Sequence, residues 1–261
     1  MPISDPKISV ITVVHNGAAT IEDSIRSVAS QDYPCIEHIV IDGASADGTQ
    51  EVVSRHLDTV AVFKSEPDRG MYDAMNKGLA LATGEIVGFL NADDIYADSQ
   101  VLREIADTLC MPEVDACYGD LVYVGRADAS KVVRHWISRP YRDGLFENGW
   151  MPAHPTFYAK RWIYDKYGGY DLVYRRQSDF ELTMRFLVVH HVRSVYIPRV
   201  LVRMRSGGAS RELMHILEGN IEAYRACRKH MLNVTPFFIV RKILSRIPQF
   251  FLRDKVEASS K

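Results

Sequence analysis

Short apolar segments alternate with amphipathic ones through the first third of the chain. Residues 7–14 (KISVITVV) form a β-branched run without polar alternation, which is typical of a strand covered on both faces. Apolar runs of strand length recur at 37–41, 60–65 and 84–90. The pattern therefore predicts four buried strands in succession.

Amphipathic segments fill the intervals between these strands. Behind the N-cap candidate Thr20, three apolar residues share one helical face: Ile21, Ile25 and Val28. A short helix is expected at 47–57. The clearest helix covers 70–84, where apolar and small residues recur at helical spacing: Met71, Ala74, Met75, Gly78, Leu79 and Ala82. We expect the two methionines and Leu79 to lie in the core.

This β-α-β-α-β-α-β order predicts an α/β protein with an open, mostly parallel sheet and helices on both faces. In such sheets, ligands bind beyond the carboxyl ends of the strands. Polar clusters stand at three of those ends: His15–Asn16, Asp42–Ser45 and Asn91–Asp94. We expect these clusters to form one rim.

The third cluster is the most acidic. Asn91, Asp93, Asp94 and Asp98 follow the apolar run that ends at Leu90. Adjacent like charges repel, so this crowding needs either full hydration or a cation. Turn acids in solvent and a metal site at the end of a strand are both consistent with the pattern.

The alternation is looser after residue 100. A helix, a hairpin arm and a loop rich in Pro, Gly and Trp are expected in turn at 101–109, 115–125 and 138–155. A further helix is predicted to begin with the capping box Ser178-x-x-Glu181. Pro198 indicates a strand pair or one interrupted strand, because proline cannot donate to a central ladder. From Glu212 onward the pattern is helical.

Composition narrows the class of protein. The chain has 261 residues, of which 47% are hydrophobic, and a net charge of -1. A sizeable core is therefore expected, and the basic excess of nucleic-acid-binding proteins is missing. The four cysteines lack CxxC spacing, which favours a reducing compartment. With no signal-peptide layout and no apolar stretch near the ~18 residues of a spanning helix, we expect a soluble protein, attached at most to a membrane surface.

Three segments carry a family resemblance: SVITVVHNG, SIRSVASQDYPCIEHIVIDGASADGT and SEPDRGMYDAMNKGLALATGEIVGFLNADD. Together they resemble the nucleotide-sugar-binding half of the inverting family 2 glycosyltransferases of GT-A fold, which is Rossmann-like. The third segment is similar to the bacterial branch that builds exopolysaccharide, such as colanic acid, and lipopolysaccharide side chains. The resemblance covers residues 7–96 and continues more thinly through 154–158, 178–182 and 205–210.

The resemblance implies a role for the acidic cluster. The family's DxD motif falls on Asn91-Ala92-Asp93, and Asp93 would bind the divalent ion, Mn²⁺ or Mg²⁺, that bridges the donor's two phosphates. Mg²⁺ commonly uses one or two carboxylates plus phosphates and water. Asn91 replaces the first acid, and its amide adds no charge. We therefore expect weak metal affinity without nucleotide.

The resemblance also implies where the nucleoside is recognised. Asp42 matches the first acid of the family's DDGS sequence, and Gly43 stands where the second acid would be. Recognition of the base would then shift to Asp68 or Arg69, or to backbone groups of Val13 to His15. Asp42 as a turn residue that ends the strand, and Asp68 and Arg69 as a solvated charged loop, are the alternatives.

Three further residues complete the nucleotide-sugar site that the resemblance implies. Asn76 belongs to the family's AMNKG stretch, and a structural role is equally open. His154 matches a position where relatives carry a histidine near the donor phosphates or metal, with a packed structural histidine as the alternative. Arg205 offers a fixed fork of donors for phosphate, and Gly207-Gly208 would let the backbone fold over it, although a plain turn explains the two glycines equally well.

The resemblance places the catalytic base on Asp179. The family carries this acid in an (E/S)D-x-(D/E)-L stretch that opens a helix, and residues 178–182 (SDFEL) have that form. A carboxylate must take the proton of the attacking acceptor hydroxyl. Glu181 is the weaker candidate because it suits the capping box. An acid in a first helical turn also meets the helix dipole favourably, without any catalytic role.

The chain ends in a basic, apolar segment at 234–256. A basic amphipathic helix suits an anionic membrane, and packing on the catalytic domain or on another subunit is the alternative. We expect a glycosyltransferase domain at 1–215, with a nucleotide-sugar-binding half (1–100) and an acceptor half (101–215), followed by a helical extension at 216–261. The expected location is the cytoplasm, or the inner face of the plasma membrane if this segment binds lipid.

These features predict a metal-dependent inverting glycosyltransferase. It would move a sugar from a nucleoside diphosphate, with a UDP-sugar as the first candidate, to a hydroxyl of a bacterial surface glycan or a polyprenyl-diphosphate-linked precursor. A nucleotidyltransferase could use the same sheet and metal site. A non-catalytic subunit of a glycan-assembly complex is the third alternative, and the presence of both Asp93 and Asp179 argues against it.

Overall fold

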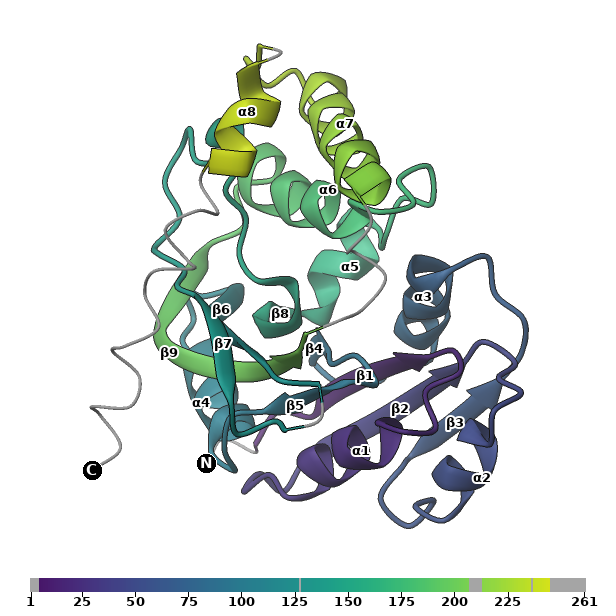
Figure 1. The fold of residues 1–261 in the computed structure, drawn as a ribbon. Coiled ribbons are helices and arrows are strands. Elements are labelled where there is room, and N and C mark those ends of the chain that lie inside the picture. The colour runs from purple at the N-terminus through teal and green to yellow at the C-terminus, as the bar shows by residue number, and fades with distance from the viewer. Residues whose placement is uncertain (1–4, 127, 207–212, 236, 245–261) are drawn as a thin grey trace.

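Four parallel strands form the N-terminal half of the central sheet in the computed structural model, which describes residues 5–126, 128–206, 213–235 and 237–244. They are β1 Ile8–Val14, β2 Ile36–Asp42, β3 Val62–Ser65 and β4 Ile86–Phe89. Strand β1 lies between β2 and β4, and β2 pairs with β3 (Figure 1). The predicted succession of strands is confirmed, except that β3 is a half-exposed edge strand.

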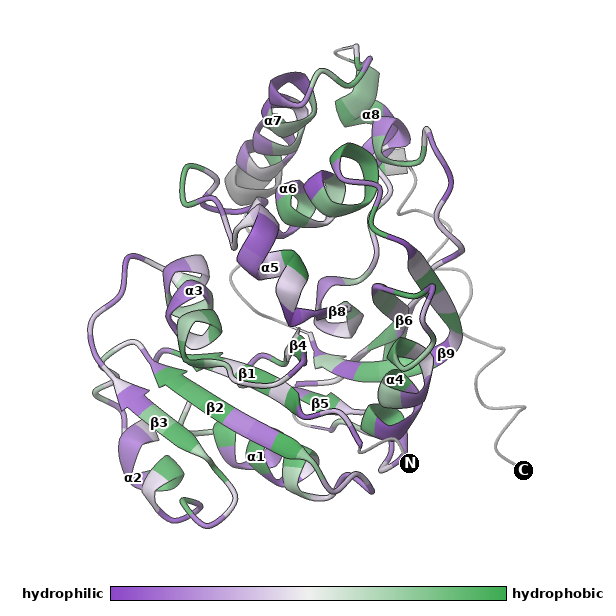
Figure 2. Ribbon diagram, turned by 180° about the vertical axis from the view of Figure 1, so that it is seen from behind, coloured by the Kyte–Doolittle hydropathy of each residue, from purple (hydrophilic) through white to green (hydrophobic). Residues whose placement is uncertain are grey.

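Helices cover both faces of this half. They are α1 Ile21–Ala29 and α2 Thr49–Ser54 on one face and α3 Met71–Leu81 on the other (Figure 1). On β2, Ile39 and Ile41 share a core cluster with Met75 of α3, whereas Val40 between them packs in a cluster with Ile25 of α1. Both faces of the strand are therefore apolar, which explains the missing alternation and the hydrophobic colouring in Figure 2.

One expected core residue lies outside the core. Met75 is buried and Leu79 packs against the core, but Met71 is 49% exposed. Helical side chains lean toward the helix N-terminus. Because Met71 is the first residue of α3, its side chain has no preceding turn to lie against. The prediction for Met71 was therefore wrong.

The second half of the sheet mixes strand directions. Its strands are β5 Asp94–Tyr96, β6 Ala116–Val124, β7 Val132–Trp136, β8 Tyr158–Lys160 and β9 Ser194–Arg205. The order along the sheet is β3-β2-β1-β4-β8-β6-β9-β5, and β7 forms a hairpin with β6. Strand β8 is antiparallel to both β4 and β6, so the sheet is parallel in its first half and mixed beyond.

Strand β9 is one interrupted strand, as Pro198 allowed. Tyr196 pairs with Tyr118 of β6, but the next registered pair is Val200 with Asp120, and the ladder shifts between them. The missing N–H of Pro198 thus falls in an irregular stretch rather than in the regular ladder.

Most of the remaining helices form a layer above the sheet, and helix α4 packs against the second half of the sheet (Figure 1). The α-helices are α4 Val101–Leu109, α5 Arg161–Tyr167, α6 Ser178–Met184, α7 Leu213–Lys229 and α8 Phe237–Leu244. Shorter turns are η1 Phe146–Asn148, η2 His154–Thr156 and the π-helical η3 Arg185–Val189.

Helices α7 and α8 pack on the rest of the protein. Ala223, Cys227 and Phe238 belong to the same core cluster as Met75. The domain boundary expected at 215/216 falls inside the first turn of α7, which begins at Leu213. Within the described ranges, none of the helices has the length and apolar character needed to span a membrane.

Candidate active site

The polar clusters at the ends of β1, β2 and β4 lie side by side. Val14 is in register with Asp42, and beyond them a ring nitrogen of His15 lies 3.0 Å from the Gly43 carbonyl oxygen. The backbone N–H of Asn16 donates to the Ser45 hydroxyl at 2.7 Å. The third cluster joins through α1, where the Ser24 hydroxyl donates to the Asn91 carbonyl. The predicted convergence is confirmed, and we call His15–Asn16, Asp42–Ser45 and Asn91–Asp94 the strand-end rim.

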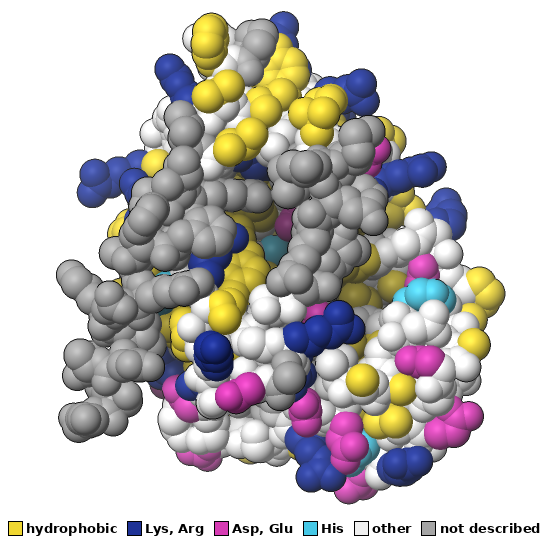
Figure 3. Space-filling view, viewed as in Figure 1, with side chains coloured by type: hydrophobic (Ala, Val, Ile, Leu, Met, Phe, Trp, Pro, Cys, Tyr) yellow, Lys and Arg dark blue, Asp and Glu magenta, His cyan; other side chains and the backbone are white. Residues whose placement is uncertain are grey.

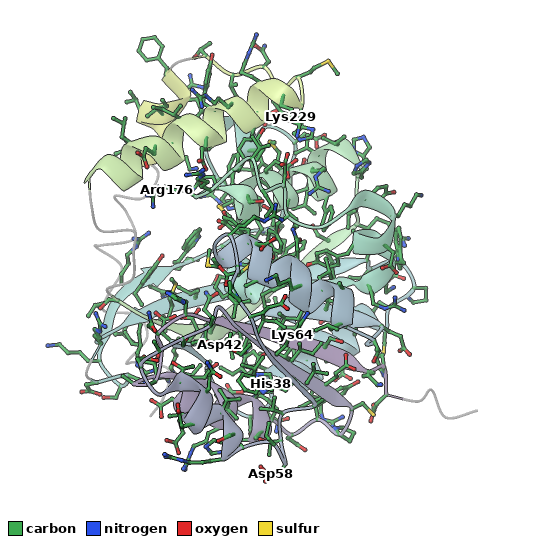
Figure 4. All side chains as sticks on the ribbon, turned by 90° about the vertical axis from the view of Figure 1, so that its right-hand side faces the viewer. His38, Asp42, Asp58, Lys64, Arg176 and Lys229 are labelled. Carbon is green, nitrogen blue, oxygen red and sulfur yellow. The ribbon has the colours of Figure 1, made fainter. Side chains whose placement is uncertain are left out.

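Asp42 is the acid of the second cluster. It is fully buried, and its carboxylate accepts hydrogen bonds from the backbone and hydroxyl of Ser45 and from the Ser65 hydroxyl at 2.6 Å. These serines hold the carboxylate at the carboxyl end of β2. Figure 4 labels Asp42 there. The Val13 side chain is buried in the sheet, so only its backbone could take part in recognition.

Asp68 fills the place of the acid that Gly43 lacks. A Cβ built on Gly43 would collide with the Asp68 carboxylate and come within 3.3 Å of His15 Nδ1. Asp68 also accepts the backbone N–H of Gly70 at 2.8 Å, which fixes its orientation. The neighbouring Arg69 turns the other way and pairs with Asp73 of α3 at 2.8 Å. Of the two residues proposed to read the base, Asp68 therefore lies against the rim.

In the described part of the chain, two buried oxygen atoms of the acidic cluster have no hydrogen-bond partner. Asn91 donates its amide to one oxygen of Asp94 at 3.0 Å, while the Asn91 amide oxygen and the second Asp94 oxygen have no hydrogen-bond partner among the described residues. Burial, and then the adjacent Asp93, raise the pKa of Asp94 well above its usual range. Burial also raises the pKa of Asp93. In both residues burial outweighs the nearby Arg205 guanidinium, which lowers these pKa values only in part.

This donor set suits a hard cation in part. Carboxylate and amide oxygens are the ligands that Mg²⁺ and Mn²⁺ take, and a cation would satisfy the unpartnered oxygens of Asn91 and Asp94. However, the part of the chain that the structure describes has no group of three or more His, Cys, Asp or Glu residues arranged to hold an ion. The protein ligands are thus few, as expected for an ion that also needs donor phosphates.

Arg205 borders this cluster, and Asp98 does not. The Arg205 guanidinium pairs with Asp23 of α1 at 2.5 Å and lies 3.5 Å from the Asp93 carbonyl oxygen. Asp98, the last acid of the sequence cluster, pairs with Arg199 instead. The glycines expected to fold over Arg205, at 207 and 208, lie outside the described residues.

A hydrogen bond from a tyrosine connects Asp179 to the first half of the molecule. The Tyr72 hydroxyl, from the first turn of α3, donates to the Asp179 carboxylate at 3.0 Å. Burial, and then Asp179, raise the pKa of Tyr72 well above its usual range, so the phenol keeps its proton. Because α3 follows the carboxyl end of β3, this bond brings the acid of α6 to the side of the sheet that carries the strand-end rim.

The capping box predicted for α6 does not form. The N-cap is Gln177 without a side-chain cap, and the Ser178 hydroxyl donates to the Asp171 carbonyl instead. Glu181 is 1% exposed and binds Arg185 and His230. Burial alone would raise the pKa of Glu181, but these two partners hold it below its ordinary value. Glu181 is therefore fixed in an ion cluster, which makes it unsuited to act as the base.

An aromatic network surrounds Asp179. Tyr72 stacks on Tyr170 with ring centroids 5.4 Å apart, and the Tyr170 hydroxyl lies 2.6 Å from His154 Nε2. Burial lowers the pKa of His154 and Asp179 opposes the shift, so the imidazole is neutral near pH 7. Asn76 exchanges two hydrogen bonds with the backbone of Tyr170. Both polar ends of Asn76 are occupied, which favours its structural alternative over the expected contact with the donor.

In Figure 3, which is viewed as in Figure 1, the surface is hollowed between the sheet and the helical layer. Histidine and acidic side chains are visible inside the hollow. Sequence reasoning missed Tyr72 and Tyr170 as members of this region. Tyr72 lies within the helical stretch of the family resemblance but carries no signal that would connect it to residue 179. Only the tertiary structure, which brings Tyr72 of α3 to Asp179 of α6, reveals the contact.

Comparison with known proteins gives consistent relatives. The chain is 33% identical over 188 residues to an uncharacterized glycosyltransferase of Mycobacterium tuberculosis, covering 71% of each protein. It is 28% identical over 191 residues to a PGL/p-HBAD biosynthesis glycosyltransferase of Mycobacterium bovis, covering 69% of each. EpsE of Bacillus subtilis, which is named as a glycosyltransferase, is 25% identical over 257 residues, which cover 93% of this chain and 90% of EpsE.

Solved structures share the fold. The mannosyltransferase PcManGT from Pyrobaculum calidifontis, in complex with GDP-Man and Mn²⁺, matches with a TM-score of 0.67 at 22% identity, over 100% of this chain and 77% of that one. Staphylococcus aureus TarS 1-349 in complex with UDP matches with a TM-score of 0.65 at 18% identity, over 97% and 77%. At these identities, the likeness supports the GT-A glycosyltransferase fold.

A family model described as Glycosyl transferase family 2 matches residues 9–175, which is more than half of the chain. The match includes the strand-end rim and stops shortly before Asp179. With this match, the named relatives and the shared fold, the chain belongs to glycosyl transferase family 2 and is a glycosyltransferase enzyme.

Proposed function

We propose that the enzyme is a metal-dependent inverting glycosyltransferase. Its donor is a nucleoside-diphosphate sugar, with a UDP-sugar as the first candidate. Its acceptor is a hydroxyl of a bacterial surface glycan or of a polyprenyl-diphosphate-linked precursor. The observation that supports this most is the hydrogen bond between Tyr72 and Asp179, because it couples a carboxylate of the second half to the helix that begins at the rim.

The strand-end rim would hold the donor. Asp42 lies buried at the end of β2, and Asp68 stands where a second acid would accept an N–H of the base. Uracil and guanine both present such an N–H, so this contact is compatible with either nucleotide. Asp93, with the unpartnered oxygens beside it, would hold the cation, which offsets the negative charge of the leaving diphosphate.

Asp179 would take the proton. The acceptor oxygen attacks the anomeric carbon and forms the new C–O bond, while the bond from that carbon to the diphosphate oxygen breaks on the opposite side. The nucleoside diphosphate leaves with the electron pair, and the acceptor proton moves to Asp179. One displacement inverts the configuration at the anomeric carbon. A positioned base of this kind contributes about 10²–10⁴ in rate.

Part of the protein would contact a membrane. On α8, Phe237, Val240 and Ile243 are 70%, 50% and 48% exposed and lie one helical turn apart, while Phe238 faces the core. The exposed Arg241 adds positive charge to this face. Such a surface suits an anionic lipid headgroup layer, and the enzyme would then work in the cytoplasm at the inner face of the plasma membrane. The rest of the tail lies outside the described residues. Co-sedimentation with anionic and neutral vesicles tests this point, and a failure to bind either kind would overturn it.

A thermal-shift screen of nucleoside diphosphates and nucleotide-sugars, each with and without Mn²⁺, tests the donor site. We expect one nucleotide to raise the melting temperature only with Mn²⁺, because selective binding to the folded state stabilises it. Asp93→Ala should abolish the metal-dependent part, and Asp179→Asn should keep it. A folded protein that no nucleotide stabilises would contradict the proposal.

A further inference from the structure

The segment that carries Asp179 is held by a helix that follows it in the chain. Glu222 of α7 accepts three successive backbone N–H groups, from Arg175 at 3.1 Å, Arg176 at 2.8 Å and Gln177 at 3.1 Å. A carboxylate has about four lone-pair positions, so one side chain can serve three donors. These N–H groups immediately precede α6, whose second residue is Asp179.

Glu222 also provides a hydrogen-bond acceptor at the start of α6, where the predicted capping box is absent. The first N–H groups of a helix and of its cap lack partners within the helix. Ser178 does not provide a cap, because its hydroxyl points to Asp171. Glu222, from another helix, instead accepts the N–H of the cap residue Gln177 and those of the two residues before it. Hydrogen bonds to an ionised acceptor are roughly twice as strong as neutral ones, so this contact fixes the path of the backbone into α6.

Other contacts from α7, and contacts from α8, surround the segment. Arg176 pairs with Glu218 at 2.9 Å, one turn before Glu222 on α7. The Lys242 ammonium of α8 donates to the Gln177 side-chain oxygen at 2.5 Å and lies 4.4 Å from the centre of the Phe180 ring. The α7 backbone passes close by, since a Cβ on Gly219 would lie 3.4 Å from Gln177. Figure 4 labels Arg176, whose side chain pairs with α7.

We propose that Glu222 is a positioning residue that sets the location of the base Asp179, an inference that rests on the proposed function. The contact joins α7 to the backbone two to four residues before the base, so it acts through placement and touches neither donor nor acceptor. A misplacement of about 1 Å at a reacting group can cost roughly 10²-fold in rate. The strand-end rim belongs to the other half of the molecule and is left unchanged.

The matched pair Glu222→Gln and Glu218→Gln tests this role. An amide at 222 offers one acceptor oxygen, and its NH₂ group faces backbone donors. The control at 218 removes only an exposed ion pair and leaves the three N–H contacts intact. With Mn²⁺, we would measure release of nucleoside diphosphate by slow hydrolysis of UDP-glucose, UDP-N-acetylglucosamine and GDP-mannose, in which water replaces the acceptor. For the donor that is hydrolysed, we expect Glu222→Gln to lower kcat about 10- to 100-fold with KM unchanged. Glu218→Gln should lower kcat less than about 2-fold.

A second measurement separates placement of the base from loss of structure. In an Asp179→Asn background, Glu222→Gln should cost almost nothing further, because there is no base left to place. Glu222→Asp, which keeps both carboxylate oxygens, should recover part of kcat. A cost at 222 that equals the cost at 218, or that persists in full without Asp179, would overturn the inference while leaving the proposed function in place. If the wild type hydrolyses none of the donors, or if Asp179→Asn keeps full hydrolysis, the proposed function fails and the inference falls with it.

Discussion

The strand-end rim and the surroundings of Asp179 are built in different ways. In the rim, the polar residues stand at or just beyond strand ends, and partners come from adjacent strand ends, such as Ser45 for Asn16 and Ser65 for Asp42. Asp179 instead depends on Tyr72, which lies 107 positions earlier in the chain. A parallel sheet places its strand ends together automatically, whereas Asp179 meets Tyr72 through a contact between distant helices. The two regions should therefore respond differently to substitution.

The largest expected effect separates chemistry from donor binding. Asp179→Asn keeps the shape of the side chain but removes the proposed base, so kcat should fall by about 10²–10⁴. The metal-dependent thermal shift with nucleotide should remain, because the rim is intact. Product formation and melting temperature, measured on the same preparation, check this prediction. Loss of nucleotide binding in this variant would show that the two regions are not separable.

Tyr72→Phe probes the contact that joins the two regions. The variant keeps the ring stacked on Tyr170 and removes only the hydroxyl that donates to Asp179. Without this bond the Asp179 carboxylate loses a contact that holds it in place, and a misplacement of about 1 Å can cost roughly 10²-fold, so kcat should fall roughly 10- to 100-fold. Tyr170→Phe is the comparison variant, because its hydroxyl contacts His154 instead. An equal or larger effect at Tyr170 would contradict the assignment of Tyr72.

Asp68→Ala tests how the rim selects the nucleobase of the donor. Removal of the carboxylate beside Gly43 should weaken the preferred nucleotide about 10-fold and reduce its preference over other nucleotides. Arg69→Ala distinguishes the alternative reader, since Arg69 is tethered to Asp73 and should matter less. Titration of UDP and GDP against each variant measures this difference. A selectivity that changes only in Arg69→Ala would reverse the assignment.

The smallest expected effect concerns pH. The folded protein raises the pKa of Asp94 well above its ordinary value of 3.8, so the folded state binds this proton more tightly than the unfolded chain does. Stability is therefore lost as the pH rises from about 4 through the folded pKa. Asn cannot ionise, so Asp94→Asn should raise the melting temperature, and by more at pH 8 than at pH 5, in the absence of metal. Thermal unfolding at both values checks the sign, and an advantage that shrinks with pH would refute it.

The sequence predicts the strand-end rim more fully than the surroundings of Asp179, and the reason is physical. Hydrophobic runs, turn residues and the positions after each strand are local signals, and these signals alone are enough to place Asp42 and Asn91 on one rim. Asp94 belongs to the sequence cluster, but its burial and its unpartnered oxygen emerge only from the packing of β5. The predicted capping box does not form because both of its members have other partners: the Ser178 hydroxyl donates to the Asp171 carbonyl, and Glu181 pairs with Arg185 and His230.

The sequence by itself determined the class of fold, the family and the identity of the acids at the strand ends, because these depend on short-range patterns and on the fixed geometry of parallel strands. The tertiary structure decided which residues serve Asp179 and which serve only the fold. Tyr72 donates to Asp179, whereas Asn76, one turn further along the same helix, is occupied by the backbone of Tyr170. A side chain's role depends on what packs against it, and contacts between distant segments leave no local trace in the sequence.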